Sequence, residues 1–104
     1  MTEAVRSSAA MPQSADPQRA LGEAVRLRRM EKGVDLTQRA LADRAGITVA
    51  HLSKLEKGRV NPTWGTMRSL AAALGLSLRE LAVRTESLIE AEADNAPERG
   101  RPTA

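Results

Sequence analysis

The chain has 104 residues, a formal net charge of +3 and no cysteine. It contains one Trp and neither Phe nor Tyr. The absence of cysteine excludes disulfides and thiolate zinc sites, and no run of about 18 apolar residues is long enough to cross a membrane. No basic N-terminal segment is followed by an apolar run, so we expect no signal peptide. We therefore expect a cytoplasmic protein with no membrane partner.

Charge is distributed unevenly along the chain. Residues 17–59 contain ten Lys or Arg and five Asp or Glu, whereas residues 86–98 contain five acidic residues and no basic one. A basic body attracts polyanions, although many small domains carry solvated basic faces. The charge pattern therefore favours a nucleic-acid partner without establishing one.

The first predicted helix follows a segment without apolar periodicity. Residues 1–16 are rich in Ser and Ala and are expected to be a disordered arm. Asp16 followed by Pro17 is typical of a helix start, with Asp as N-cap and Pro in the first turn. The helix is expected to reach about Glu31, before Gly33 ends it. Its predicted inward stripe is Leu21, Ala24, Val25, Leu27 and Met30.

Two short helices are predicted next. Residues 38–45 form the first, capped by Thr37 and ended by Gly46, and residues 49–57 form the second, capped by Thr48. The inward side chains of the pair are expected to be Ala40, Leu41, Ala45, Leu52 and Leu55. The outward side of the second helix combines small apolar and basic side chains: Val49, Ala50, His51 and Lys54. Such a surface suits a partner better than water alone.

The last two predicted helices follow Thr63 and Ser77, which are expected to cap them. The first ends at Gly75, and its apolar face consists of Trp64, Met67, Leu70, Ala71 and Leu74. Trp64 is expected to lie in the core or at the domain edge. The second begins at Leu78 and carries a long stripe: Leu78, Leu81, Ala82, Thr85, Leu88, Ile89 and Glu92. No segment alternates with period two, so the predicted fold class is all-α.

The second and third helices meet the requirements of a helix-turn-helix pair, expected at about residues 37–57. A tight turn needs a residue that tolerates positive φ, and Gly46 stands there. Two closely crossing helices need a small residue at the crossing, and Ala42 lies one turn earlier. Apolar side chains that attach the pair to the domain follow at suitable spacing: Leu41, Ile47, Leu52 and Leu55.

At these residues the chain resembles the Cro/lambda-repressor-like helix-turn-helix domains, also called the XRE family. The resemblance lies in "LTQRALADRAGITVAHLSKLEKGRVNPTWGTMRSLAAALGLSLREL", preceded by "AVRLRR". It implies a compact five-helix, lambda-repressor-like DNA-binding domain over residues 17–84. We expect a helical extension over residues 85–93 and disordered ends at residues 1–16 and 94–104.

The resemblance also implies which residues contact double-stranded DNA. The third helix would be the recognition helix, with its N-terminal residues at base edges in the major groove. Base contacts would come from Thr48, Val49, Ala50 and Lys54. Lys54 would donate to guanine, while Val49 and Ala50 would pack on thymine methyl groups. Contacts to the DNA backbone would come from Gln38, His51, Lys57, Arg59 and Asn61.

Two further features concern orientation and assembly. The resemblance implies that Arg29 pairs with Glu56 and thereby steadies the recognition helix. Leu88 and Ile89 extend the apolar stripe beyond what the domain core needs, so they are candidates for a homodimer contact. The alternative is that this helix end folds onto its own domain. A homodimer would read a palindrome whose half-sites lie about one helical turn apart.

Three functions remain open on the sequence. The first is a sequence-specific DNA-binding transcriptional regulator: a bacterial homodimeric repressor that reads a palindromic operator and is nucleoid-associated when bound. The second is an antitoxin that binds its own promoter and neutralises a small toxin partner. The third is a protein–protein adaptor, against which the basic residues Lys54 and Arg59 argue.

An enzyme is not expected. The only histidine, His51, lies in the predicted recognition helix, and no carboxylate pair is placed as acid and base in a pocket. The chain offers too few ligands for a metal site, so we expect no metal and no cofactor. RNA binding lacks the stacking aromatic residues that it commonly uses.

Overall fold

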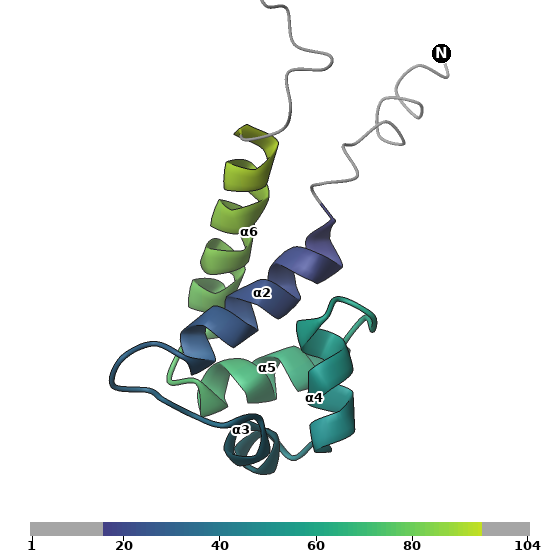
Figure 1. Ribbon diagram of the computed structural model, residues 1–104, viewed down its shortest axis with the longest axis vertical. Helices are drawn as coiled ribbons and strands as arrows, with labels where there is room; N and C mark the ends of the chain where they lie inside the picture. The colour runs from purple at the N-terminus through teal and green to yellow at the C-terminus, as the bar shows by residue number, and fades with distance from the viewer. Residues whose placement is uncertain (1–15, 95–104) are drawn as a thin grey trace, which may run out of the picture.

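The computed structural model describes residues 16–94, which form five α-helices and no strand (Figure 1). The helices are α2 (Pro17–Arg29), α3 (Gln38–Ala45), α4 (Val49–Glu56), α5 (Trp64–Ala73) and α6 (Leu78–Asp94). The predicted all-α, five-helix fold is confirmed. The predicted disordered ends lie outside the described residues, apart from Asp16 and Asp94.

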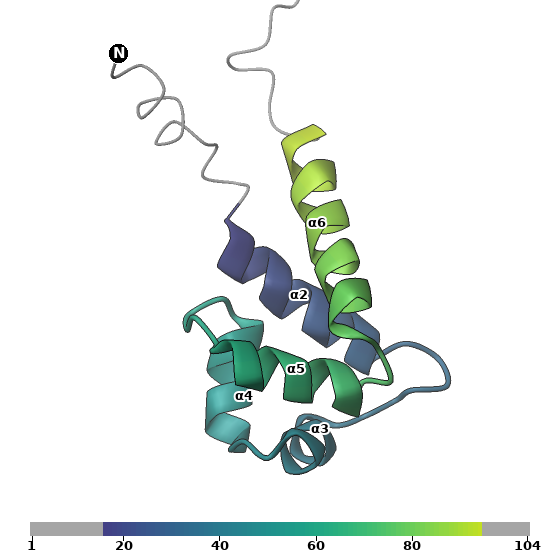
Figure 2. The same ribbon diagram turned by 180° about the vertical axis from the view of Figure 1, so that it is seen from behind.

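The helices are arranged with α3, α4 and α5 together at one end of the molecule (Figures 1 and 2). α2 runs across this group, and α6 packs against α2 and rises away from α3 and α4. Among the residues that the structure describes, no helix is long and apolar enough to cross a membrane.

Each helix start is fixed by the side chain that the sequence predicts as its cap. Each cap oxygen accepts a hydrogen bond from the backbone N–H group two or three residues ahead, at 3.0–3.1 Å. Asp16 accepts from Gln18, Thr37 from Ala40, Thr48 from His51, Thr63 from Thr66 and Ser77 from Glu80. Ser77 N–H also donates to Glu80 Oε1 at 2.7 Å, which completes a capping box. A cap contributes about 1 kcal/mol, so these contacts set where the helices begin.

One apolar core joins all five helices. Its largest fully buried side chains come from every helix or its cap: Val25, Leu41, Leu52, Leu55, Leu70, Leu74 and Leu81. Ala42 of α3 is fully buried as well. The inward faces predicted for α3 and α4 are therefore confirmed, except that Ala40 is only partly buried.

The inward stripe predicted for α2 is wrong at its C-terminal end. Leu27 and Met30 are 42% and 55% exposed, and the helix ends at Arg29 rather than near Glu31. At 100° per residue, these two positions lie on the far side of the helix from Val25. Arg28 and Arg29 occupy the inward side instead. Arg28 Nε donates to the carbonyl oxygen of Leu74 at 3.0 Å.

Trp64 and Leu88, two apolar side chains for which the sequence predicts contacts, differ in their exposure. Trp64, the first residue of α5, is 66% exposed and stands at the domain edge rather than in the core. Leu88, a candidate for a dimer contact, packs against the core of its own chain. This is the alternative that the sequence leaves open. Ile89 is partly buried.

Gly22 allows α2 and α4 to cross closely. A Cβ atom at this position would lie 2.3 Å from the carbonyl oxygen of Leu55 and 2.7 Å from that of Glu56. Both obstacles are backbone atoms, which a rotamer change cannot move. The position of the C-terminal end of α4 therefore depends on the missing side chain, a role that the sequence did not reveal.

Glu31 links α2 to α6. Its carboxylate accepts from Arg84 Nη1 of α6 and from Arg28 Nη1, the latter at 2.6 Å. The hydrogen bond from Arg84, followed by that from Arg28, lowers the pKa of Glu31 below 4.5. The carboxylate is therefore stabilised in its ionised form by two guanidinium groups.

Replacing Gly22 by Ala is expected to lower the free energy of unfolding by about 1–3 kcal/mol, because α2 and α4 must separate to admit the Cβ atom. Thermal and urea unfolding followed by circular dichroism measure this loss. Gly65→Ala in α5 is the control, since its Cβ atom would have no neighbour closer than 4.0 Å. Equal stability of Gly22→Ala and the wild type would contradict the close crossing.

Replacing Glu31 by Gln is expected to lower the melting temperature at neutral pH, because the charge that both arginines bind is removed. The folded-state pKa of Glu31 is depressed, so its contribution is fully present above pH 4.5 and is lost as the pH falls through the folded pKa. The difference in melting temperature between variant and wild type should therefore shrink below pH 4.5. A difference that is the same at neutral and acidic pH would refute this role.

Candidate nucleic-acid interface

The turn between α3 and α4 consists of Gly46, Ile47 and Thr48. Gly46 has a φ of 74°, in the left-handed region, and Ile47 N–H donates to the carbonyl oxygen of Ala42 at 3.0 Å. Ile47 packs against the core, and the side chain of Thr48 caps α4. The three residues thus end one helix, attach the turn to the domain and start the next helix.

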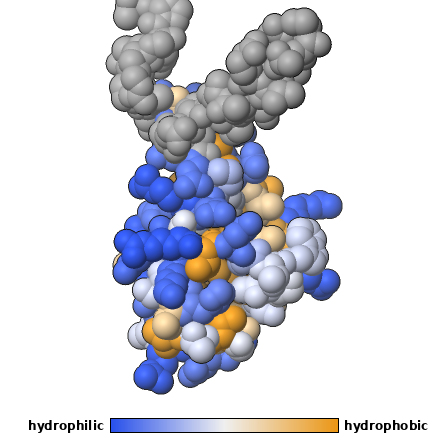
Figure 3. Space-filling view, turned by 90° about the vertical axis from the view of Figure 1, so that its right-hand side faces the viewer, coloured by the Kyte–Doolittle hydropathy of each residue, from blue (hydrophilic) through white to orange (hydrophobic). Residues whose placement is uncertain are grey.

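α4 presents an outward stripe that is small at its start and basic further on. Ala50 and Lys54 of α4 and Lys57, its C-cap, are exposed and recur at steps of four and three, which places them on one side of the helix. Thr48 is exposed beside this stripe, and His51 is partly buried. The side of the molecule where α4 lies is largely hydrophilic, with small hydrophobic patches (Figure 3).

Val49 differs from its expected placement in the exposed first turn. It is partly buried and packs against the core. The reason is helical geometry, since Val49 lies three residues before the fully buried Leu52 and shares its side of α4. Only part of its side chain is accessible to a partner.

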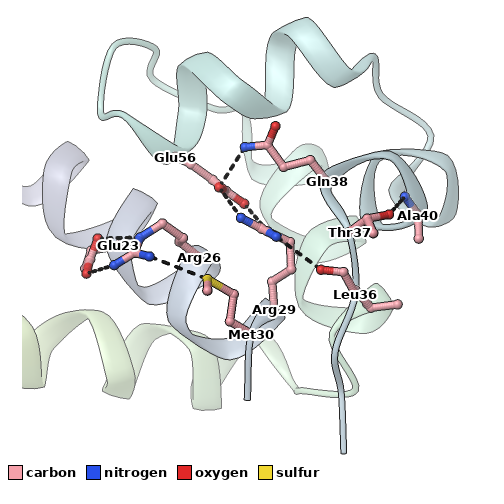
Figure 4. A network of polar contacts seen from close by, with 9 residues as sticks. All are labelled: Glu23, Arg26, Arg29, Met30, Leu36, Thr37, Gln38, Ala40 and Glu56. Carbon is pink, nitrogen blue, oxygen red and sulfur yellow. Dashed lines mark hydrogen bonds and ion pairs between the residues drawn. The ribbon is translucent and has the colours of Figure 1, made fainter. Parts of the chain in front are cut away.

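A buried polar network connects α2, α3 and α4 (Figure 4). Arg29 donates to both carboxylate oxygens of Glu56, from Nε to Oε2 at 2.7 Å and from Nη2 to Oε1 at 2.9 Å. Its remaining Nη1 donates to the carbonyl oxygen of Leu36 at 3.1 Å. The side chains of Arg29 and Glu56 are only 13% and 3% exposed. The pair is therefore shielded from water and fixed in a bidentate geometry.

Gln38 is the third member of this network. Its Nε2 donates to Glu56 Oε1 at 2.9 Å, so one of the two N–H donors of the amide group expected at a DNA phosphate is used within the protein. Figure 4 shows the amide oxygen of Gln38 directed away from Glu56. Within residues 16–94, the backbone N–H groups of Gln38 and Arg39 in the first turn of α3 have no acceptor. The start of α3 thus retains unpaired N–H donors.

The residues that follow α4 form an exposed basic loop. Lys57, Arg59 and Asn61 are all exposed. Gly58 has a φ of 74°, and a Cβ atom there would lie 2.8 Å from Cα of Arg19, so the loop runs closely past the start of α2. Asn61 also borders a groove beside α6. Across the described residues, no cluster of His, Asp or Glu is placed to hold a metal ion.

Replacing Glu56 by Gln is expected to lower the free energy of unfolding by about 3–5 kcal/mol, because Arg29 is left as a buried charge without a counter-ion. Chemical unfolding measures the loss. Glu23→Gln is a matched control, since the pair of Glu23 with Arg26 has both side chains about 40% exposed and should contribute little. Equal losses of unfolding free energy in the two variants would contradict the larger contribution expected from the buried pair.

The sequence and the fold both have known relatives. The family described as helix-turn-helix domain matches residues 20–84. An HTH-type transcriptional regulator of Sinorhizobium fredii, y4dJ, is 51% identical over 61 residues, which cover 59% of this chain and 75% of the relative. The immunity repressor protein of Bacillus phage phi105 is 34% identical over 67 residues, 64% of this chain but only 46% of the repressor.

Solved structures give the same assignment. A crystal structure of the clp gene regulator ClgR from Corynebacterium glutamicum superimposes with a TM-score of 0.70 and 28% identity, covering 84% of this chain and 96% of that one. The restriction-modification controller protein C.AhdI from Aeromonas hydrophila gives a TM-score of 0.57 and 31% identity, covering 62% and 94%. The chain belongs to the helix-turn-helix family of transcriptional regulators, in its Cro/lambda-repressor-like form.

Proposed function

We propose that the chain is a sequence-specific repressor that binds double-stranded DNA as a homodimer and reads a palindromic operator through the major groove. The observation that carries this proposal is the outward stripe of α4. Ala50, Lys54 and Lys57 are exposed on one side of a helix whose orientation is fixed by the buried Arg29–Glu56 pair. A rigidly held helix with small residues at its start can approach base edges closely.

Each residue of this surface has a proposed role. Lys54 donates to guanine O6 and N7, and Ala50 packs on a thymine methyl group. Thr48 and the accessible part of Val49 contact the adjacent base. The DNA backbone is bound by His51, Lys57, Arg59 and Asn61, together with the unpaired N–H groups at the start of α3. Gln38 holds Glu56 through one amide N–H group and contacts a phosphate with the second.

The family and the exposed basic stripe support the proposed function over the other two hypotheses. Relatives named as transcriptional regulators and as a repressor support gene regulation. The exposed basic stripe supports a polyanion partner rather than a protein adaptor. No feature of residues 16–94 favours a toxin as the partner over a second copy of this chain.

Replacing Lys54 by Ala is expected to weaken operator binding by about 1–3 kcal/mol and to relax the preference at one base pair. The operator is first selected from genomic fragments, and affinity is then measured by fluorescence anisotropy at several salt concentrations. Lys57→Ala, a phosphate contact, should weaken all sequences similarly and reduce the salt slope by about 1. Lys32→Ala, in the loop after α2, is the control.

Two results would contradict this proposal. Uniformly weak binding of the wild type, without a preferred sequence, would exclude a sequence-specific regulator. If Lys54→Ala kept the affinity and the sequence preference of the wild type, α4 would not be the helix that reads bases in the major groove.

A further inference from the structure

Trp64 lies between two hollows in the surface of the molecule. The first hollow, about 560 Å³, is bordered by the first turns of α2 and α5 and by the N-terminal half of α6. The second, about 310 Å³, follows the outer side of α5 to the start of α6. Trp64 and Leu78 border both hollows, so the two are neighbours that these side chains separate. Figure 2 shows α5 and α6 in front of α2, diverging from one another. Because Trp64 is 66% exposed, it forms a ridge between the hollows.

The two hollows and the ridge together form what we call the α5 surface. On one side of the ridge, Trp64, Arg68 and Ala72 are exposed and recur at steps of four, which places them on one side of α5. On the other side, Met67 and Leu78 are partly buried and add apolar wall to the first hollow. Trp, Met and Arg are the side chains enriched where proteins bind one another, and Trp and Arg often dominate the binding energy. The composition of the α5 surface is therefore that of a protein-binding site.

The charges beside the ridge are basic. Arg79 borders the first hollow and Arg68 the second, and within residues 16–94 neither forms an ion pair. Glu80 is engaged in the capping box of α6, and Glu86 lies about 10 Å along the axis of α6 from Arg79. An occupant that covers Trp64 therefore meets two guanidinium groups, which favours acidic side chains in that occupant.

The shape of the α5 surface indicates the kind of occupant. A small ligand is usually enclosed by one concave site, whereas the ridge of Trp64 divides this surface in two. Nucleic acid offers phosphate groups to arginine but no aliphatic side chains to fill apolar hollows. An amphipathic helix meets both requirements. Its apolar side chains, one or two turns apart, enter neighbouring hollows, while acidic residues on its flanks reach the arginines.

We propose that the α5 surface binds an acidic amphipathic helix of a different protein. Apolar side chains of that helix fill the hollows on either side of Trp64, and acidic residues beside them pair with Arg68 and Arg79. Of the residues proposed to contact DNA, only Asn61 borders either hollow. The outward stripe of α4 therefore stays accessible, and the contact adds a protein partner to the proposed DNA reading.

Designed peptides test the apolar and the charged part of this recognition. The acidic probe is a helical peptide of about 14 residues, roughly four turns, with Leu on one face, Glu on its flanks and no Trp. One control peptide carries Lys in place of every Glu, and the other carries Ser in place of every Leu. Trp64 is the only Trp of the chain, which has no Tyr, so its emission reports on the α5 surface. We expect a saturable blue shift with the acidic probe and none with either control at the same concentrations.

Variants of the full chain locate the contact. Arg68→Glu and Arg79→Glu are each expected to weaken binding of the acidic probe by about five-fold or more, and the double variant is expected to bind the Lys peptide instead. Trp64→Ala is expected to weaken it by about ten-fold or more, measured by fluorescence anisotropy of the labelled probe. Lys32→Glu makes the same change of charge outside both hollows and should behave as wild type. Circular dichroism checks that each variant keeps the wild-type helix content.

Four outcomes would overturn the proposed contact. The acidic probe fails to bind the wild type, either control peptide binds equally well, or neither charge reversal weakens binding. In the fourth, the emission of Trp64 shifts to the blue with protein concentration alone, which would mean that a second copy covers the α5 surface.

Operator binding is measured separately, without peptide. Arg68→Glu is expected to keep the operator affinity of the wild type, and a loss as large as that of Lys57→Ala would assign this arginine to phosphate and overturn the protein contact. A wild type that binds the acidic probe but shows no sequence preference refutes only the proposed DNA reading. A wild type that prefers its operator but does not bind the probe refutes only the protein contact.

Discussion

The buried pair of Arg29 and Glu56 is the contact on which the arrangement of the DNA-facing helices depends. A carboxylate that is 3% exposed is tolerable only with full compensation, and here three side-chain donors from Arg29 and Gln38 bind its two oxygens. The last turn of α4 cannot move relative to α2 or to the start of α3 without leaving a charge unpaired. The carbonyl oxygen of Leu36 accepts from the remaining nitrogen of the guanidinium group, which links the α2–α3 loop to the same network.

Two close backbone approaches reinforce this constraint. Gly22 lets α2 lie directly against the carbonyl groups at the end of α4, and Gly58 lets the following loop pass the start of α2. Polar and steric contacts thus act on the same end of α4, while Gly46 and Ile47 position the other end. The helix proposed to read bases is held at both ends, which is what recognition by a few side chains requires.

The basic stripe of α4 and the acidic helix α6 extend toward different ends of the molecule (Figures 1 and 2). The outward stripe of α4 is basic and lies at the end formed by α3, α4 and α5, whereas α6 rises toward the other end (Figures 1 and 2). The acidic residues of α6 are thereby kept away from the surface proposed to meet phosphate. In the proposed homodimer, the second copy adds a second reading helix, and two half-sites raise specificity more than one.

The sequence alone determined the elements of this protein and their order, because capping side chains, terminal glycines and apolar spacing act within one helical turn. Thr37, Gly46 and Thr48 specify the helix-turn-helix from local chemistry. The tertiary structure decided which side of α2 faces inward, since Arg28 and Arg29 find partners 46 and 27 residues away. It also decided that Gln38 binds Glu56, that Gly22 is a crossing point and that Leu88 serves its own core. These depend on contacts between distant segments, which no local pattern encodes.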